Sequence, residues 1–436
     1  MRIARIGNLR FPVPAKEYGG TERSMAQMTA FQAAICGHDI TIYAPSDSDI
    51  IGFTYEISSK LGLASRMDPS QSSIDIINAD GRVGRVRLRS AGIQSIGYEE
   101  DPQEIIKHTN LLAELLQDEH SDPFDIVHCH DRRYMAKNVF PAGLASKTLV
   151  HHHNVRLGRW YCSNPYPLVC ISHSQAALLK ANYDAIVYDV IQHGLDAYTR
   201  SLSAEHAGYL AWIGRFLANK GADRSIKIAR QAGIPLVMAG VVYKLNPGSQ
   251  RHFDEQVEPY VDIHDPRFLT RIAAMTSAEV RAEIASLRAA TGKSAPVIFS
   301  GPADERQKQA LYGNAMATLF PISWPEPFGL VMIESMACGT PVIAYKSIGD
   351  VHCGAVAEVI DDGVTGFALS VKDEGDGIAQ AANAIGSAAL LDRGAVRRVF
   401  DQRWTSERVA RQLDITYLRF IGNSDGRRIG GEHQRR

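Results

Sequence analysis

The sequence predicts an α/β protein with two Rossmann-like domains. Three observations support this prediction. Residues 2–44 contain an apolar strand, a glycine-containing loop, a helix and a second strand, which is the order of a βαβ unit. Residues 209–240 repeat this order. Residues 317–345 hold two more apolar strands on either side of a proline-rich loop and a helix. The length of 436 residues agrees with a chain of two or three domains.

Composition excludes several classes of protein. A hydrophobic content of 45% and a charged content of 22% are typical of a soluble globular protein. A net charge of −1 argues against nucleic acid as the main partner. No apolar stretch is long enough for a signal peptide or a membrane span, and the six cysteines lack CxxC spacing, which indicates reduced, buried thiols. We therefore expect a cytoplasmic protein, and leave peripheral membrane contact and the oligomeric state open.

The first predicted domain starts with a strand at residues 2–6 and a loop that ends in Gly19 and Gly20. Thr21 is the expected N-cap of the following helix. The unit lacks the GxGxxG pattern of dinucleotide-binding proteins. Asp47-Ser48-Asp49 imitates a metal-binding Asp-x-Asp motif, but it lies in a polar loop after the second strand, so we interpret it as a solvated turn.

Histidines lie at the ends of two predicted strands. His130 lies in the polar end of the strand at residues 124–131. Because parallel sheets bind ligands at the carboxyl ends of their strands, His130 is a candidate site residue; the alternative is a core histidine with satisfied hydrogen bonds. The next strand ends in His151-His152-His153. Adjacent strand residues point to opposite faces, so we expect that these three cannot converge and predict no metal site.

The second predicted domain opens with a strand at residues 209–213, followed by a loop with Arg215 and Lys220 and then a helix. Two cations at a strand end beside a helix N-terminus suit a diphosphate; the alternative is a surface loop with two solvated bases. Residues 245–294 separate two strands that are normally joined by a short connection, and Thr276 with Glu279 predicts a capping box there. We expect an inserted helical subdomain, and leave open whether it is a lid, an acceptor determinant or an oligomer contact.

Residues 320–341 form the most informative run of the sequence. Three prolines hold an extended loop that carries Glu326. Gly329 allows close backbone approach to a ligand, and a helix from about residue 330 carries Glu334. The free amides of a helix N-terminus favour phosphate, whereas carboxylates accept hydrogen bonds from sugar hydroxyls. The run therefore predicts a phosphorylated sugar ligand; the alternative is a structural corner with two solvated acids.

These motifs resemble those of the retaining glycosyltransferases of family 4, which have the GT-B fold and a Glu-x7-Glu signature. The resemblance implies two Rossmann-like domains that face a central cleft, with a C-terminal helix that crosses back to the first domain. We expect a first, acceptor-side domain at 1–196, a donor-binding domain at 207–402 with the insertion at about 245–294, a crossover helix at 403–421 and a disordered tail at 422–436.

The resemblance also implies the reaction: transfer of a sugar from a nucleotide diphosphosugar, with retention, without metal or cofactor, to an unknown acceptor in carbohydrate biosynthesis. Glu326 is expected near the reacting carbon, Glu334 at the ribose hydroxyls, and Arg215 and Lys220 at the diphosphate. The implied catalytic residues are His130, Glu326, Arg215 and Lys220. The implied donor-binding residues are Gly19, Gly20, Arg215, Lys220, Phe328, Gly329, Leu330 and Glu334.

Two features depart from the family. His193 stands where the family's Asn-Gly-Ile-Asp turn has asparagine, and residues 349–358 replace the usual Gly-Gly loop. The second change places loop contacts to the sugar in doubt. The alternatives that we keep are another GT-B enzyme, such as a nucleotide-sugar epimerase or a phosphorylase, and a non-catalytic protein that binds nucleotide sugars.

Overall fold

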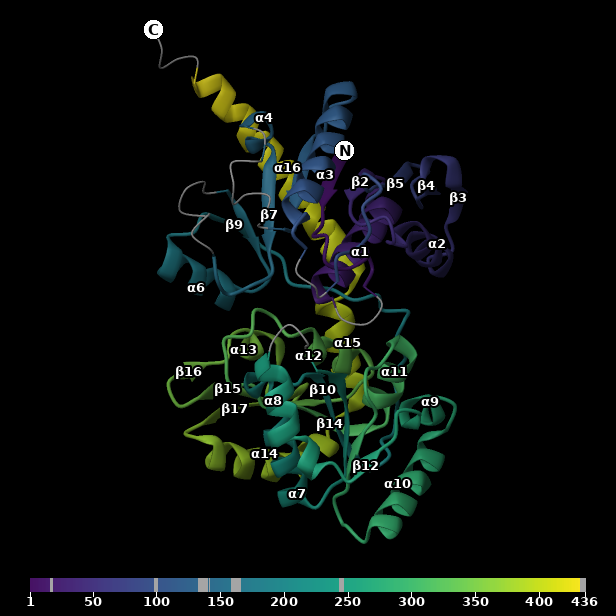
Figure 1. Ribbon diagram of the computed structural model, residues 1–436, viewed down its shortest axis with the longest axis vertical. Helices are drawn as coiled ribbons and strands as arrows, with labels where there is room; N and C mark the ends of the chain where they lie inside the picture. Colours follow the sequence, from purple (N-terminus) through teal and green to yellow (C-terminus); the bar gives the residue numbers. More distant parts are fainter. Residues whose placement is uncertain are drawn as a thin grey trace. The chain divides into compact units, whose positions relative to one another are not determined.

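The computed structural model of the chain is shown in Figure 1. It describes residues 1–15, 19–97, 101–131, 140, 142–157, 166–242 and 247–431. The chain forms two compact units: unit 1 comprises Met1–Asp196 and Thr405–Arg436, and unit 2 comprises Ala197–Trp404. None of the helices in the described ranges has the length and apolar character that a membrane span needs.

Unit 1 is built on a nine-stranded sheet with the order β3-β4-β5-β2-β1-β6-β7-β8-β9. The strands from β5 through β9 in this order are parallel, whereas β4 is antiparallel to both β3 and β5. The strands are β1 (Arg2–Ile6), β2 (Asp39–Tyr43), β3 (Ala64–Asp68), β4 (Ser73–Ile77), β5 (Val83–Arg89), β6 (Ile126–Cys129), β7 (Thr148–His152), β8 (Leu168–Cys170) and β9 (Val187–Val190).

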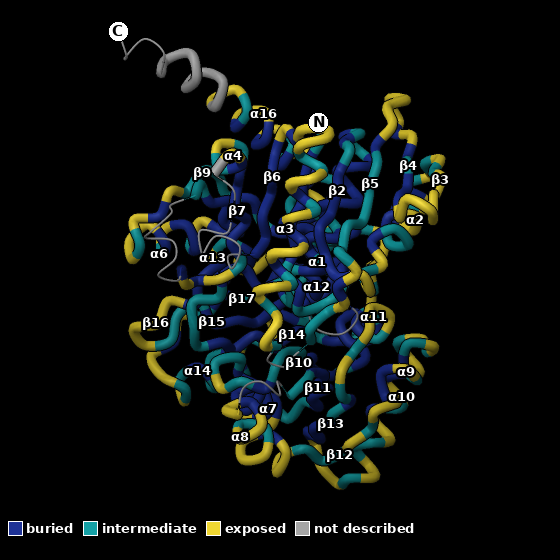
Figure 2. Tube along the Cα trace, turned by 45° about the horizontal axis from the view of Figure 1, so that its top comes forward, coloured by how far each residue is buried: buried dark blue, intermediate teal, exposed yellow. Residues whose placement is uncertain are grey.

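Helices cover both faces of this sheet, which explains why its central strands are buried on both sides. Ile3 of β1 packs on one face with α1 and α16, and Ala4 packs on the other face with α3 and α6. Figure 2 shows β2, β6 and β7 as buried over nearly their whole length. The helical segments are α1 (Gly20–Phe31), η1 (Gln32–Cys36), α2 (Ile50–Lys60), η2 (Pro69–Gln71), α3 (Glu104–Ser121), α4 (Ala142–Ala145), α6 (His173–Tyr183) and α16 (Ser406–Gly431).

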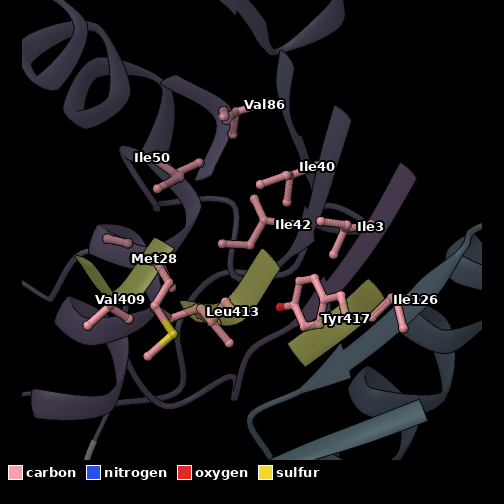
Figure 3. Close-up of a cluster of buried hydrophobic side chains, with 14 of the residues drawn as sticks. Ile3, Met28, Ile40, Ile42, Ile50, Val86, Ile126, Val409, Leu413 and Tyr417 are labelled. Atoms are coloured by element: carbon pink, nitrogen blue, oxygen red, sulfur yellow. The ribbon is translucent and has the colours of Figure 1, made fainter. Parts of the chain in front are cut away.

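The C-terminal helix α16 belongs to the core of unit 1. Val409, Leu413 and Tyr417 pack in one cluster with Ile3 and Ile126 of the sheet (Figure 3). The predicted crossover of the last helix to the first domain is therefore confirmed. The helix runs from Ser406 to Gly431, and residues 432–436 lie outside the described part. The predicted disorder of residues 422–436 stays a prediction.

Unit 2 contains an eight-stranded sheet with the order β12-β13-β11-β10-β14-β15-β16, and β17 also pairs with β15. All pairs are parallel except the β15–β16 hairpin. The strands are β10 (Tyr209–Arg215), β11 (Leu236–Val241), β12 (Ile263–His264), β13 (Val297–Phe299), β14 (Ala315–Phe320), β15 (Val342–Ile348), β16 (Val351–His352) and β17 (Gly366–Val371). The helical segments are η4 (Ala218–Lys220), α7 (Ala222–Ala232), α8 (Pro247–Gln256), η5 (Glu258–Tyr260), α9 (Phe268–Ile272), α10 (Ser277–Thr291), α11 (Glu305–Gly313), α12 (Leu330–Ala337), α13 (Val356–Val359), α14 (Glu374–Ala389) and α15 (Arg393–Arg403).

The segment between β11 and β13 differs from the predicted helical subdomain. Thr276 and Glu279 do form a capping box at the start of α10. However, β12 extends the sheet, and Phe268 and Val280 pack in the same core cluster as Tyr209 of β10. The described part of the insertion, from Pro247 onward, is thus part of the core of unit 2, because its helices bury their apolar stripes there.

Unit 2 starts earlier than the predicted boundary at residue 207. Arg397 of α15 donates to the carbonyls of Ala197 at 2.9 Å and Arg200 at 2.6 Å. Arg200 is itself buried. These contacts join the segment between the two predicted domains to unit 2, and Trp404, which is fully buried, ends the unit.

Truncation of Leu413 should destabilise unit 1, because its buried side chain fills the space between α16 and the sheet. We expect Leu413→Ala to lower the free energy of unfolding by about 2–5 kcal/mol in urea denaturation. Leu418 lies on the same helix and is 57% exposed, so Leu418→Ala is the matched control and should change stability by less than about 0.5 kcal/mol. Equal effects of the two substitutions would show that α16 does not pack as described.

Candidate active site

Two loops of unit 2 are tied together at the carboxyl ends of β10 and β14. The backbone N–H of Ser323 donates to the carbonyl of Asn219 at 3.0 Å. The buried guanidinium of Arg224 donates to the carbonyls of Pro321 at 2.8 Å and Ala218 at 2.9 Å. A guanidinium presents its donors in a rigid fork, so one side chain fixes both loops. Arg224 was not identified from the sequence, since a single arginine in a helix carries no local signal.

Lys220 and Glu326 meet between these loops. The Lys220 ammonium lies 2.5 Å from the Glu326 carboxylate, and the two side chains are only 15% and 12% exposed. The indole N–H of Trp324 donates to the same carboxylate oxygen at 2.9 Å. The ammonium also lies 4.5 Å from the centroid of the Trp324 ring, within the range of a cation–π contact. The sequence predicted both residues at a donor site, and the structure places them in direct contact.

Four other residues predicted at the donor belong to β10 and to the turn that leads from Glu326 into α12. Arg215 is the last residue of β10, and Phe328 is buried. Gly329 is the N-cap of α12 with φ +89°, and Leu330 is the first residue of that helix. A side chain would be strained at this φ, so glycine is required for the turn. The amides at the start of α12 thus follow Glu326 closely in the chain.

The loop at residues 349–358 packs against the backbone of Glu326. Gly354 has φ +69°, and a Cβ atom there would lie 2.1 Å from the carbonyl oxygen of Glu326. The N–H of Ala355 donates to that carbonyl at 3.0 Å. The thiol of Cys353, also buried, donates to the carbonyl of Ile322 at 3.4 Å. The unusual sequence of this loop therefore has a structural role beside the candidate site.

Glu334 lies in a buried cluster of charges. Its carboxylate accepts hydrogen bonds from Lys308 at 3.2 Å and from the Tyr312 hydroxyl at 2.9 Å, and the Arg200 guanidinium lies 3.4 Å away. Burial, followed by the nearby Glu334 charge, raises the pKa of Tyr312. Burial lowers the pKa of Arg200, but attraction to Glu305 and Glu334 outweighs it, and the pKa is raised overall. The ribose-binding role of Glu334 stays a prediction.

In unit 1, His130 lines a polar pocket of about 340 Å³. Gly19 is the N-cap of α1, and Gly20 is the first residue of that helix, so the prediction of Thr21 as N-cap is wrong. Burial raises the pKa of Glu22, which also lines the pocket. The lining residues are Asn8, Arg10, Phe11, Thr21, Glu22, His130, Asp131, His151, His152, His153 and Asn154.

The histidines of this region form a hydrogen-bonded network. His130 Nδ1 and His153 Nε2 are 3.0 Å apart, and His151 Nδ1 and His128 Nε2 are 3.2 Å apart. The three adjacent histidines do not converge, as expected: His151 and His153 are two residues apart and share a face, whereas His152 belongs to none of the histidine clusters. His193 joins the cluster, with its ring centroid 5.4 Å from that of His153. Burial lowers the pKa of all five rings, to about 4 for His193.

The Asp47-Ser48-Asp49 segment has structural partners within unit 1. Asp49 is the N-cap of α2, and its carboxylate accepts from the N–H of Gly52 at 3.1 Å. Asp47 accepts from the N–H of Ser95 at 2.8 Å and from its hydroxyl at 2.6 Å. The interpretation of this segment as a turn is confirmed.

Most of unit 2 is similar to glycosyltransferase domains of known proteins. Residues 199–387 match a family model described as "Glycosyl transferases group 1". The D-inositol 3-phosphate glycosyltransferases of Mycobacterium bovis and Mycobacterium tuberculosis are 32% identical over 152 residues, which cover 32% of this chain and 29% of theirs. The chain thus spans less than a third of the length of these relatives.

Solved structures match almost the whole chain. A sucrose-phosphate synthase from Thermosynechococcus elongatus is 18% identical with a TM-score of 0.61, over 97% of this chain and 99% of that one. AviGT4, a glycosyltransferase of avilamycin A biosynthesis, is 18% identical with a TM-score of 0.60, over 97% and 98%. HepE of Anabaena, solved with UDP and glucose, is 14% identical with a TM-score of 0.55, over 95% and 99%. These matches confirm the predicted GT-B fold.

Removal of the Glu334 charge should destabilise unit 2, because it leaves Arg200 and Lys308, whose side chains are 3% and 5% exposed, with less compensation. We expect Glu334→Gln to lower the free energy of unfolding by about 3 kcal/mol in urea denaturation. Glu305 contacts the same two cations but is 47% exposed, so Glu305→Gln should lower it by about 1 kcal/mol or less. A Glu334→Gln protein as stable as the wild type would show that the cluster is not as buried as described.

Proposed function

We propose that this chain is a retaining glycosyltransferase, which moves a sugar from a nucleoside diphosphosugar to an acceptor and needs no metal ion for the transfer. The observation that carries the proposal is the contact between Lys220 and Glu326, which lies beside the N-terminus of α12. Lys220 offers a cation for a diphosphate, and Glu326 offers an acceptor for sugar hydroxyls. A nucleoside diphosphosugar is the ligand that carries both groups, joined by the bond that breaks.

When the donor binds, Lys220 and Glu326 each exchange their contact with one another for a contact with the donor. The diphosphate takes the Lys220 ammonium from Glu326, with Arg215 as a second cation, and the amides at the start of α12 face the phosphate oxygens. Glu326 then accepts from sugar hydroxyls, and the Trp324 indole keeps its carboxylate oriented. As the bond to the sugar breaks, negative charge grows on the leaving diphosphate, and the two cations stabilise it. In metal-dependent transferases a divalent ion stabilises this charge; here Lys220 and Arg215 would do so.

Retention follows if acceptor attack and diphosphate departure occur on the same face of the sugar. In this mechanism the leaving diphosphate oxygen takes the proton of the acceptor hydroxyl, and no protein carboxylate is a nucleophile. Glu334 holds the ribose hydroxyls, and its bonds to Lys308 and Tyr312 fix its orientation.

The pocket of unit 1 is the proposed acceptor side. His130 is held neutral by burial, which lowers its pKa, so its ring can accept or donate a hydrogen bond to an acceptor hydroxyl. Gly19 and Gly20 lie in the segment that opens α1, where the backbone can approach a ligand.

We also infer a cytoplasmic location. The described cysteines are buried thiols without a disulfide, as expected in a reducing compartment. They are Cys36, Cys129, Cys170, Cys338 and Cys353; Cys162 lies outside the described residues.

A screen of nucleoside diphosphosugars by thermal unfolding tests the proposal first, since a ligand at 100 times its Kd adds ~2.7 kcal/mol of stability. The donor that stabilises the protein is then incubated with candidate acceptors after excess EDTA, and the product is analysed by NMR. We expect transfer to persist in EDTA and the anomeric configuration of the donor to be kept. Inversion, or activity that returns only with manganese, would contradict the proposed chemistry. Donor binding without either hydrolysis or transfer would favour a non-catalytic binding protein.

Lys220→Met should lower kcat by roughly 10²–10³, similar to the loss of one oxyanion-hole donor, because the ammonium stabilises charge that develops as the diphosphate leaves. Lys227→Met is the matched control: this lysine of α7 is 48% exposed and pairs with Glu374 at the surface. Steady-state kinetics should show near-normal kcat for the control. If Lys220→Met raised only KM, the ammonium would bind ground and transition states equally.

Gly354→Ala should impair the transfer without unfolding the protein, because the new Cβ would displace the backbone of Glu326. A misplacement of about 1 Å can lower the rate roughly 10²-fold. Gly363→Ala introduces the same backbone strain at φ +73° but meets no atom within 4 Å, so it controls for strain alone. Equal kinetics of the two variants would show that the position of Glu326 does not matter.

A further inference from the structure

We propose that His151, His153 and His193 of unit 1 form a binding site for one transition-metal ion that prefers imidazole nitrogen, with Zn²⁺ as the expected occupant. His151 lies in β7, His153 follows that strand, and His193 lies in the segment after β9. None of these residues belongs to the proposed donor site, and the proposal does not depend on the transfer reaction.

The three rings lie close together. One nitrogen from each ring can be chosen so that all three lie within 4.8 Å of one another. The ring centroids are 4.7 Å (His151–His153), 5.4 Å (His153–His193) and 6.2 Å (His151–His193) apart. The centroids thus form a triangle, and the ring planes are nearly parallel, with interplanar angles of 6°, 7° and 3° for the same three pairs. Zinc binds nitrogen at about 2.0–2.1 Å in a tetrahedron, which places ligand nitrogens about 3.4 Å apart. Binding one ion would therefore need the rings to rotate about their side-chain bonds, so that a nitrogen of each ring turns toward the ion at that spacing.

Each ring already has one nitrogen occupied by a hydrogen bond. His151 Nδ1 pairs with His128 at 3.2 Å, His153 Nε2 with His130 at 3.0 Å, and His193 Nδ1 with the Ser24 hydroxyl at 2.8 Å. Metal-binding imidazoles have this arrangement, because the outer hydrogen bond fixes the ring and its tautomer while the second nitrogen binds the ion.

Two of the remaining nitrogens have no partner. His151 Nε2 and His153 Nδ1 are buried and make no hydrogen bond with the described atoms. Buried polar atoms in native proteins are almost always satisfied, so orphaned nitrogens indicate a missing ligand. His151 and His153 also line the 340 Å³ pocket, which provides room for a water molecule as a fourth ligand.

The ligand type selects the class of ion. Three neutral imidazoles suit Zn²⁺, Cu²⁺, Ni²⁺ or Co²⁺, whereas Mg²⁺ and Ca²⁺ require oxygen ligands. A bound metal ion would cross-link the end of β7 to the segment after β9. Because the ion would bind only the folded protein, it would stabilise unit 1 against unfolding.

Two neighbouring clusters are weaker candidates. His128, with His130 and His151, has its second nitrogen engaged by the Tyr417 hydroxyl at 2.6 Å. In the group of Cys36, His38 and Asp414, the nitrogens of His38 contact Asp414 at 2.9 Å and the amino group of Met1 at 3.4 Å. The first group leaves two orphaned nitrogens, His130 Nε2 and His151 Nε2, but both nitrogens of His128 are engaged, so it offers only two ligands. In the second group neither nitrogen of His38 is orphaned.

Titration with Co²⁺ tests the site without any substitution. Tag-free full-length protein is treated with EDTA, dialysed and titrated with Co²⁺ under visible spectroscopy. We expect one Co²⁺ per chain, with the ligand-field bands of a low-symmetry nitrogen site and complete displacement by Zn²⁺. Absence of saturable binding would overturn the proposal. A thiolate-to-cobalt charge-transfer band would also overturn it, because the proposed ligands include no thiol.

Substitutions then assign the ligands. His193→Asn introduces the residue that family 4 enzymes have in the similar turn, so the variant should fold, and circular dichroism checks that it does. The affinity of His193→Asn for Zn²⁺ should fall by at least about tenfold. The affinity of His153→Asn should fall by a similar factor. His120→Asn removes an exposed histidine of α3 and Cys36→Ser removes the competing thiol, and both should bind Zn²⁺ as the wild type does. Unchanged affinity in His193→Asn, or loss in Cys36→Ser, would contradict the assignment.

Discussion

The ion pair between Lys220 and Glu326 is the interaction on which the candidate active site depends. It joins residues that are 106 positions apart in the chain, on loops that follow two neighbouring strands. Both side chains are largely shielded from water, so each charge needs the other until a ligand supplies a replacement. A ligand with a diphosphate for Lys220 and hydroxyl groups for Glu326 satisfies both at once. A ligand with only one of these groups leaves the other charge poorly compensated.

The surroundings of the pair keep its geometry fixed. Arg224 ties the two loops through backbone carbonyls, and Gly354 and Gly221 allow a close approach that side chains would prevent. At Gly221 a Cβ atom would lie 2.3 Å from the carbonyl oxygen of Pro321. Rigid support of this kind holds catalytic groups in position before the ligand arrives. The loop at residues 349–358, which departs from the family pattern, is part of that support.

Much of this could be predicted from the sequence, because local patterns determine local structure. Alternating strands and helices, the glycine loops and the proline-rich run led to the GT-B fold and to the two loops of the candidate site. The strand β12 has only two residues, too few for a periodic signal. The contact of Lys220 with Glu326, and the action of Arg224, depend on tertiary packing and leave no local pattern. The convergence of His151 and His153 could have been predicted, because residues two apart on a strand share a face; the misleading signal was the adjacent His152.

Calorimetry of UDP binding to wild type and Glu326→Gln would test the proposed exchange of partners at Lys220. In the free protein Glu326 competes with a diphosphate for the ammonium. Removal of its charge should therefore strengthen UDP binding, by about tenfold or ~1.4 kcal/mol, although the variant transfers sugar slowly. If Glu326→Gln bound UDP as weakly as the wild type, or more weakly, Lys220 would not be the cation that holds the diphosphate, and the pair would be only a structural link between two loops.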